Sequence, residues 1–480
     1  MPGFPSSNDL HLLSATEAAS AIRDGSVTAL AYATALLHRC RQNTDLKAFI
    51  TLDENAVLEQ ARLADLDRTS NKPMGPLHGV PIAIKDSINT RDFPTSVGTK
   101  VLAGFRPQHD ADIIAPLKAS GAILFGKNNL VEMSYGLTGV NAHYGQARNP
   151  YDKTRITGGS SNGAGASVAA GLVPAALGGD TVGSIRVPAS LCGIVGFRPT
   201  TGRWPGNGVA PISHTLDTLG PMARSVEDCA LLDAIVTGRS PATATAGRSL
   251  KSMRIGYAPK QHLDLIDADV ERAFKLSLEK MKDAGAELVE IDLGDDFMSL
   301  GMEANWPIFW HETIPHVTEY LEACGAPVTF QQIVDGLGEN VKRLWGHAVL
   351  PGSPNYVSRD AYLKSLNVLR PQLQKRYADA YRSNGIDALV YPTTPAVAPL
   401  IGADSKMTIA GQEVDILTIG KNGFASSCAG LPGLTLPIGL SVEGMPIGME
   451  IDGRPNEDAR LLDLATRISA IVGQISPPAI

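Results

Sequence analysis

The stretch GGSSNGAGASVAAGLVPAALGGDTVGSIRVPAS occupies residues 158–190 and is rich in glycine, alanine and serine. It contains no histidine, and Asp180 is its only acidic residue. Residues 164–170 favour a helix whose small side chains would let neighbouring elements approach closely. We therefore expect the stretch to lie in a tightly packed part of the fold. Its serines, at Ser160 and Ser184 above all, need a separate explanation.

Helical patterns begin near the N-terminus. In SATEAASAIRDG, Ser14 and Glu17 form a capping box, and Gly25 is a natural helix stop. Thr28 can cap a second helix, whose apolar residues share one face. These signals predict a set of N-terminal helices at about 13–68.

Short apolar runs alternate with the later helical patterns. VPIAIKD has the composition of a buried strand and carries Lys85 at its end. Residues 112–126 and 270–292 each contain a helix that stops at glycine and is followed by a strand. Strands that helices bury on both faces imply the α/β class, so we expect one large α/β/α sandwich with a mixed central sheet. Because no linker composition interrupts the chain, residues 1–480 are predicted to form a single domain.

The composition disfavours several classes of function. A chain of 480 residues with 44% hydrophobic and 19% charged residues can bury a large core. Its net charge of -7 and the absence of a basic stripe argue against nucleic acid or an anionic membrane as a partner. The five cysteines are far apart, which predicts reduced thiols and no zinc site. Without a visible signal peptide or membrane span, the expected location is the cytoplasm.

The serines of the opening stretch are candidates for nucleophilic catalysis. Neither G-x-x-x-x-G-K-[ST] nor a G-x-G-x-x-G motif between a strand and a helix occurs, so phosphate binding is disfavoured. A serine nucleophile needs a base, and no histidine is near in sequence. A lysine that burial keeps neutral is the obvious alternative.

Three separated motifs occur along the chain. GPLHGVPIAIKD ends at Asp86, GGSS is at residues 158–161, and GDTVGSIRVPASLCGIVGFRPTTGR is at 179–203. Together they resemble the amidase signature family of Ser-Ser-Lys hydrolases. The likeness covers most of the chain and is loosest at about 237–387, where we expect the substrate pocket. Within the family, the chain is most similar to amidases that act on small arylacetamides, such as mandelamide and indoleacetamide hydrolases.

The resemblance implies a role for each central residue. The family's nucleophile falls on Ser184, its bridging serine on Ser160 and its lysine base on Lys85. Ser184 would form an acyl-enzyme while Ser160 relays the proton between Ser184 and Lys85. The family pattern also implies a cis peptide bond between Gly159 and Ser160. It implies no cofactor and no metal.

Residues around the nucleophile are expected to support it. The resemblance places the oxyanion hole on the backbone N–H groups of Thr181, Val182, Gly183 and Ser184. Asp180 and Arg186 are similar to a family ion pair that braces this loop, and Ser161 is expected to support the hydrogen-bond network.

Two positions depart from the family pattern. Val182 stands where glycine is commoner, and GGSSGG reads GGSSNG with Asn162. A β-branched residue avoids positive φ, so Val182 is either extended or the hole is reshaped. Asn162 tolerates left-handed φ better than most residues. These two departures leave the predicted Ser-Ser-Lys chemistry unchanged, and they affect the prediction of which substrate the site accepts.

Aromatic residues mark the predicted substrate pocket. The segment ANWPIFWHETIPH concentrates Trp306 and Trp310 in a chain with only 5% aromatic residues. Met133 and Tyr135 come from GKNNLVEMSYG, another segment similar to the family. Core packing explains such a cluster about as well as an apolar acyl or aryl pocket does.

The combined prediction is an amidase that hydrolyses the C–N bond of a small aryl or hydrophobic amide with water. Ester or carbamate cleavage would use the same residues. A second alternative is a glutaminase similar to the one in glutamyl-tRNA amidotransferase, which releases ammonia from glutamine for a partner complex. A third is a catalytically silent binding protein of the same fold. The sequence leaves open whether the chain forms a homodimer.

Overall fold

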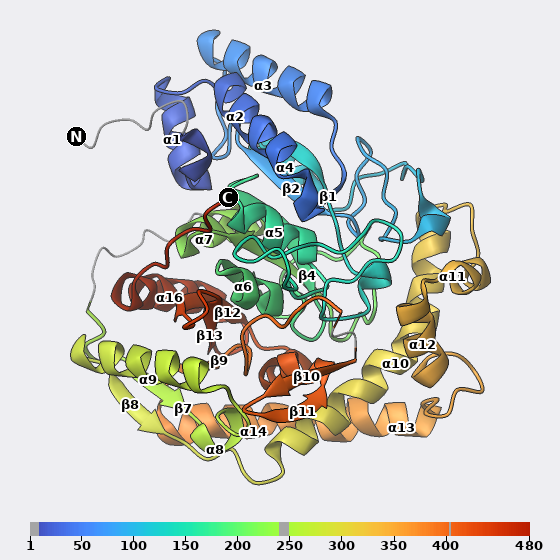
Figure 1. Ribbon diagram of the computed structural model, residues 1–480, viewed down its shortest axis with the longest axis vertical. Coiled ribbons are helices and arrows are strands. Elements are labelled where there is room, and N and C mark those ends of the chain that lie inside the picture. The colour runs from blue at the N-terminus through green and yellow to red at the C-terminus, as the bar shows by residue number, and fades with distance from the viewer. Residues whose placement is uncertain (1–8, 240–248, 403–404) are drawn as a thin grey trace.

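A computed structural model describes residues 9–239, 249–402 and 405–480. Within this part of the chain, one central sheet has the strand order β1-β3-β2-β4-β6-β5-β12-β13-β9-β7-β8 (Figure 1). A separate hairpin pairs β10 with β11. The strands are β1 (Phe49–Thr51), β2 (Pro81–Lys85), β3 (Ile123–Asn128), β4 (Ala175–Asp180), β5 (Val195–Arg198), β6 (Thr218–Ala223), β7 (Arg254–Tyr257), β8 (Glu287–Glu290), β9 (Ala388–Pro392), β10 (Lys406–Ile409), β11 (Gln412–Asp415), β12 (Gly433–Leu440) and β13 (Pro446–Asp452).

The sheet is mixed, as the sequence predicts. β2 pairs in parallel with β3 and β4, and β7 pairs in parallel with β8 and β9. The remaining pairings within the sheet are antiparallel. Parallel neighbours need a crossover connection, and helices supply several of them. The helix α4 (Ile114–Ala119), for example, lies between β2 and β3 in the chain.

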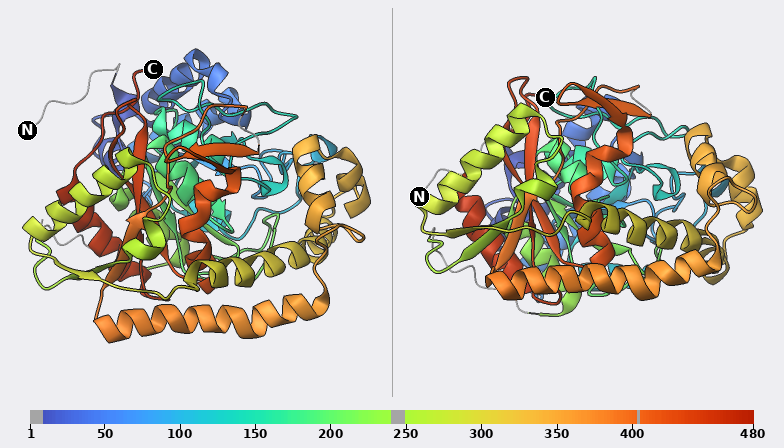
Figure 2. Two further views of the ribbon diagram at one scale, coloured as in Figure 1. Left: turned by 60° about the horizontal axis from the view of Figure 1, so that its bottom comes forward. Right: turned by 90° about the horizontal axis from the view of Figure 1, so that it is seen from below.

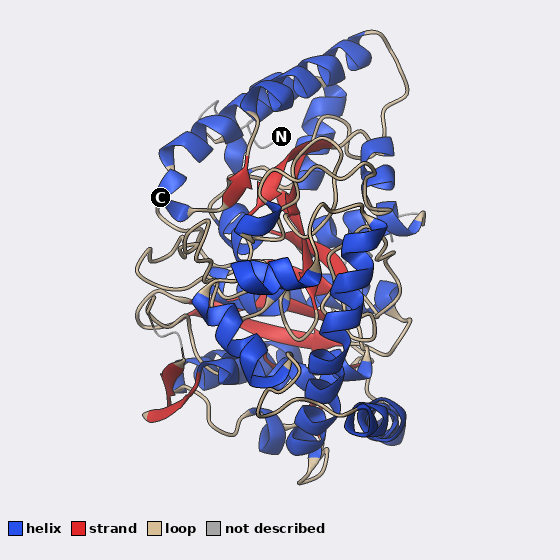
Figure 3. Cartoon of the chain, turned by 90° about the vertical axis from the view of Figure 1, so that its right-hand side faces the viewer, coloured by secondary structure: helices blue, strands red, loops and turns tan. Residues whose placement is uncertain are grey.

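Helices cover both faces of the sheet (Figure 3), which confirms the α/β/α prediction. α5 (Asn162–Ala169) and α6 (Arg186–Cys192) pack on one face. Side chains alternate along β13, so Glu450 points toward α6 while its neighbours point to the opposite face. That opposite face packs against α7 (Val226–Thr237), α9 (Ala268–Asp283) and α16 (Asp458–Val472).

The N-terminal helices begin where their caps predict. α1 (Ala15–Asp24) has the Ser14 and Glu17 capping box and ends at Gly25, whose φ is 81°. α2 (Ala29–Gln42) is capped by the Thr28 hydroxyl. α3 (Glu54–Thr69) completes the set. The region predicted as helical is not helical throughout, however, because β1 lies between α2 and α3 and joins the sheet edge beside β3.

The divergent region at 237–387, of which residues 240–248 lie outside the described chain, is mostly helical. Its strands β7 and β8 extend the central sheet, so they share that sheet with the motif-bearing strands. Figure 2 shows the long orange helical segment that contains α13 and α14 along the outer side of the molecule. The helices are α8 (Pro259–His262), α9, α10 (Phe297–Ala323), α11 (Phe330–Gly336), α12 (Glu339–Ala348), α13 (Arg359–Lys364) and α14 (Arg370–Asn384).

Small residues give α5 its close packing, as expected for residues 164–170. A Cβ added to Gly163 would lie 2.3 Å from the carbonyl oxygen of Ala48, and one added to Gly165 would lie 3.2 Å from Cβ of Pro188. Larger side chains would push α5 away from α6 and from the loop after β3. No helix in the described ranges combines the length and apolar character needed to cross a bilayer.

Candidate active site

Lys85 and Ser160 are in direct contact at the end of β2. Lys85 is the last residue of β2, every residue of which is buried, and Ser160 lies just before α5. Lys85 Nζ donates a hydrogen bond to Ser160 Oγ at 2.9 Å and to the carbonyl of Gly179 at 3.4 Å. A buried strand thus holds the amine against the hydroxyl that the resemblance assigns as its partner.

The two serine loops lie side by side. The peptide bond between Gly159 and Ser160 is cis, as expected. The backbone N–H of Ser161 donates to the carbonyl of Ser184 at 3.2 Å, which ties the loop before α5 to the loop between β4 and α6. Ser184 is 3% exposed. Lys85, Ser160 and Ser184 are therefore brought to one buried region from three separate segments.

Burial changes the protonation of the lysine. It lowers the pKa of Lys85 to about 7, although the negative charges of Asp217 and Asp180 oppose that shift. An amine with this pKa is about half neutral at pH 7 and can accept a proton. Burial also raises the pKa of Asp217, whose carboxylate accepts hydrogen bonds from Thr181 Oγ1 at 2.6 Å and from the backbone of Ile212 at 2.8 Å.

The four backbone amides assigned to the oxyanion hole are not equivalent. Gly183 donates its N–H to Asp180 Oδ1 at 2.7 Å, so this group is already engaged within the loop. Three candidate donors remain, on Thr181, Val182 and Ser184. The positive φ of the loop, 126°, falls on Gly183 and not on Val182. A valine therefore fits this loop without unfavourable φ, which accounts for the departure from the family pattern.

Asp180 is the centre of a buried ion-pair network beneath this loop. Arg186 Nε and Arg198 Nη1 each lie 3.0 Å from its carboxylate oxygens, and Arg186 Nη1 also bonds Glu450 at 3.1 Å. Burial by itself would raise the pKa of Asp180, but the charges of Arg186 and Arg198 outweigh burial and hold the pKa well below its usual range. The carboxylate thus stays ionised and anchors the start of α6.

Ser161 holds the end of β4 in place. Its hydroxyl donates to the carbonyl of Gly179 at 3.2 Å and lies 3.3 Å from the backbone N–H of Gly179. The same carbonyl receives the second hydrogen bond of Lys85. Asn162 begins α5 with a negative φ and bonds the carbonyl of Gly139 at 3.0 Å. The structure therefore does not require at Asn162 the left-handed φ that asparagine tolerates.

Sequence reasoning assigned no role to Arg198, Glu450 or Asp217. Arg198 ends the apolar run IVGFR, and a charge at the end of a buried strand is a signal that could have been used. Asp217 stands in HTLDTLGP, a segment similar to the family. Glu450 lies inside an apolar strand, where its burial implies a cationic partner.

A small apolar cavity of about 30 Å³ adjoins Ser184. Three of the predicted pocket residues, Tyr135, Trp306 and Trp310, line this acyl-side cavity, whereas Met133 packs into the core beside it. The indoles of Trp306 and Trp310 are stacked with ring centroids 5.4 Å apart. The other lining residues are Ser134, Gly136, Leu137, Thr181, Val182, Ile212, Phe309, Leu344 and Leu417.

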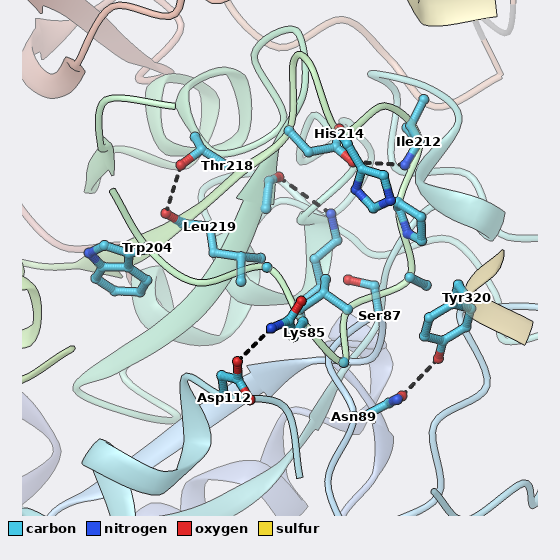
Figure 4. A pocket seen from close by; sticks show the side chains of 18 of the residues that line it. Lys85, Ser87, Asn89, Asp112, Trp204, Ile212, His214, Thr218, Leu219 and Tyr320 are labelled. Atoms are coloured by element: carbon cyan, nitrogen blue, oxygen red, sulfur yellow. Dashed lines mark hydrogen bonds between the residues drawn. The ribbon is translucent and has the colours of Figure 1, made fainter. Parts of the chain in front are cut away.

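A larger cavity of about 550 Å³ adjoins Lys85 (Figure 4). This lysine-side cavity and the acyl-side cavity share Ser134, Thr181 and Ile212 in their linings. The two cavities therefore meet at the segment that carries the candidate oxyanion donors. One opens beside Ser184 and the other beside Lys85.

Comparisons with known proteins agree with the motifs. The chain is 37% identical to the mandelamide hydrolase of Pseudomonas putida over 488 residues, which covers 99% of this chain and 94% of the relative. It is 33% identical to an indoleacetamide hydrolase of Rhizobium radiobacter, covering 91% and 92% of the two chains. It is 35% identical to one chain of the glutamyl-tRNA(Gln) amidotransferase of Chloroflexus aurantiacus, covering 95% of each.

Solved structures and the family pattern lead to the same assignment. A crystal structure of an amidase matches with a TM-score of 0.85 and 29% sequence identity, covering 96% of this chain and 100% of that chain. The sequence model of the family described as Amidase matches residues 31–462. The chain belongs to the amidase signature family and is an amidohydrolase.

Proposed function

We propose that this enzyme hydrolyses small amides with a hydrophobic, aryl-bearing acyl group, and that it works without a partner protein. The observation that carries the proposal is the lining of the acyl-side cavity. Ser184 shares that lining with Tyr135, Trp306 and Trp310, and no residue among those described there is charged. Such a surface favours an apolar acyl group over a charged one.

In the proposed mechanism, Ser184 attacks the carbonyl carbon of the amide. Its proton passes through Ser160 to Lys85, which is neutral in a substantial fraction of molecules near pH 7. The negative charge on the carbonyl oxygen is stabilised by backbone N–H groups, for which Thr181, Val182 and Ser184 are the remaining candidates.

The C–N bond then breaks as the leaving nitrogen takes a proton from Ser160, which is reprotonated by Lys85. This step leaves the acyl group esterified to Ser184. Water attacks the ester carbonyl and gives its proton to the same relay, after which the C–O bond to Ser184 breaks. The products are the amine and the carboxylic acid, and the serine hydroxyl is restored.

The size of the acyl-side cavity limits the acyl group. At about 30 Å³ the cavity holds a small group, whereas cavities that take a benzene ring have volumes of about 150 Å³. An aryl group therefore requires Trp306 or Trp310 to turn outward. Both indoles are only half buried, and side-chain rearrangements of this kind are common when ligands bind.

The lining of the acyl-side cavity also bears on whether glutamine is the substrate. Glutamine carries an ammonium and a carboxylate on its acyl part, and the acyl-side cavity offers no ion-pair partner for either. The names of the relatives include both aryl-amide hydrolases and an amidotransferase, so the names alone do not decide. Esters and carbamates would enter the same site.

The cysteines are free thiols, which fits a reducing compartment, and we place the enzyme in the cytoplasm.

Ammonia release from a substrate panel tests the proposal. The purified chain, without ATP or tRNA, is assayed with mandelamide, indoleacetamide, propionamide and glutamine, and acid release is followed for matched aryl esters and carbamates. We expect kcat/KM for an aryl amide to exceed that for glutamine by at least about 100-fold. Preference for glutamine would contradict the proposal. Labelling by a fluorophosphonate that is lost in Ser184→Ala would exclude a silent binding protein.

A further inference from the structure

The lysine-side cavity is far larger than the leaving group of a primary amide requires. Hydrolysis of a primary amide releases ammonia, which is about the size of water, and a water molecule needs a cavity of only about 10–15 Å³. The cavity beside Lys85 has a volume of about 550 Å³. Its volume therefore exceeds the need of ammonia by more than an order of magnitude.

The order of the proton relay decides which part of a substrate faces this cavity. The leaving nitrogen must receive its proton from Ser160, whose hydroxyl is hydrogen-bonded to Lys85, and Lys85 lines the cavity. The carbonyl oxygen points toward the backbone amides near Thr181, at the junction of the two cavities. With the acyl group beside the aromatic residues, the substituent on nitrogen extends into the lysine-side cavity.

The lining of the lysine-side cavity includes several side chains that can form hydrogen bonds, among them Asn89, Asp112 and Tyr320 (Figure 4). Tyr320 donates its hydroxyl proton to Asn89 Oδ1 at 2.7 Å, and Asn207 Nδ2 donates to Asp112 Oδ2 at 2.9 Å. These side chains keep further donors and acceptors for a bound group. The acyl-side cavity, in contrast, has an apolar lining without charged residues.

The charges in the lining favour one sign of ligand. Its carboxylates are Asp110, Asp112, Asp180, Asp217 and Glu319, while Lys85 is its only lysine and no arginine is among the described lining residues. Asp180 and Asp110 are compensated by cationic side chains. Asp112 and Asp217 have hydrogen-bond donors and no ion-pair partner within the described chain. An anionic group would meet unfavourable potential here.

We propose that the lysine-side cavity binds the amine portion of N-substituted amides, and that this portion is polar and either neutral or positively charged. The proposal rests on the amidase function proposed above, because it assigns the second half of the same substrate. It adds a leaving-group specificity: the preferred substrates would be secondary amides that release a polar amine in place of ammonia.

A series of amides with one acyl group and different nitrogen substituents tests the proposal. The acyl group is the best one found in the panel above, and the nitrogen carries hydrogen, 2-hydroxyethyl, 2-aminoethyl, propyl or carboxymethyl. We expect kcat/KM for the 2-hydroxyethyl and 2-aminoethyl amides to equal or exceed that of the primary amide. The carboxymethyl amide should be at least about tenfold slower than either polar amide.

Three results would overturn the proposal. Turnover of the primary amide with no turnover of any N-substituted amide would show that the cavity does not take the amine. Preference for the carboxymethyl amide, or for propyl over both polar amides, would contradict the predicted chemistry. Failure of every amide, the primary one included, would instead remove the amidase proposal on which this one rests.

Two variants test whether the cavity itself is responsible. Ala210 lines the cavity and is half buried, so Ala210→Phe should lower the ratio of kcat/KM for the 2-aminoethyl amide to that for the primary amide about tenfold. Asp112→Asn should lower the ratio for 2-aminoethyl over propyl several-fold. The control Asp295→Asn removes an exposed carboxylate outside the lining and should leave both ratios unchanged. Unchanged ratios in both cavity variants would refute the assignment.

Discussion

The loop around Ser184 and the divergent helical region are each stabilised by a different kind of interaction. Around Ser184, the side chains of Asp180, Arg186 and Arg198 form a buried network of charge-assisted hydrogen bonds. In the acyl-side cavity, α10 presents Trp306 and Trp310 in an aromatic cluster without charged partners. We therefore expect the first region to tolerate few substitutions, whereas the second should keep its fold when its apolar side chains are exchanged.

Glu312 connects the two regions. It lies on α10, two residues after Trp310, and accepts hydrogen bonds from Thr215 Oγ1 at 2.6 Å and Tyr362 OH at 2.8 Å. Thr215 belongs to the loop that ends at Asp217, near Lys85. The helix that shapes the acyl-side cavity thus also supports a loop beside Lys85. This contact couples the position of α10 to the position of the loop that precedes β6.

The largest expected effect is that of Ser184→Ala. Because no other group can form the acyl-enzyme in the proposed mechanism, amide hydrolysis should fall by at least about 10⁴-fold, and fluorophosphonate labelling should disappear. Ser160→Ala should slow turnover by orders of magnitude and still permit slow labelling of Ser184. Rate assays and intact-mass measurement check both. Labelling that survives Ser184→Ala would show that the nucleophile lies elsewhere.

Lys85→Arg should lower kcat/KM by about 10³-fold or more, because a guanidinium stays protonated and cannot serve as the base. In the unaltered enzyme the neutral amine is the active form, so kcat/KM should rise with pH and level off above a midpoint near 7. A pH profile measured with a substrate that does not itself titrate checks this. Near-normal hydrolysis by Lys85→Arg, with the same pH limb, would exclude Lys85 as the base.

Arg186→Leu should lower the free energy of unfolding by about 3–5 kcal/mol, because it leaves Asp180 and Glu450 buried with fewer cationic partners. Urea denaturation followed by circular dichroism measures the change. Arg382→Leu is the control, since Arg382 pairs with Asp379 at the surface and its loss should cost less than about 1 kcal/mol. Equal effects of the two substitutions would show that the buried network does not stabilise the fold.

Trp310→Ala should have the smallest effect on activity, and this effect should be limited to the preference between substrates. Because an aryl group requires Trp306 or Trp310 to turn outward, loss of the indole should raise the ratio of kcat/KM for an aryl amide to kcat/KM for propionamide several-fold. Steady-state kinetics with both substrates measure the split. A uniform loss for the two would mean that Trp310 acts on the fold or on Ser184 and not on acyl selection.

The sequence predicts much of this molecule because several signals are local. The caps at Ser14 and Thr28 place the first helices within a residue, and the apolar run before Lys85 identifies a buried strand. α10 was not predicted, because Pro307 and Pro315 interrupt the usual helical pattern and the protein tolerates both inside the helix. The local sequence pattern of α10 disfavours a continuous helix, but tertiary packing stabilises one.

Residue type and order were enough to predict the motifs and the α/β class, and they made Lys85, Ser160 and Ser184 the candidate catalytic residues. The tertiary structure was needed to show that Lys85 contacts Ser160, that Gly183 donates its N–H to Asp180, and that two unlike cavities meet beside Thr181. The physical reason is that a hydrogen bond or a shared cavity wall depends on ångström-scale positions of segments far apart in the chain. Periodicity and spacing along the sequence do not encode those positions.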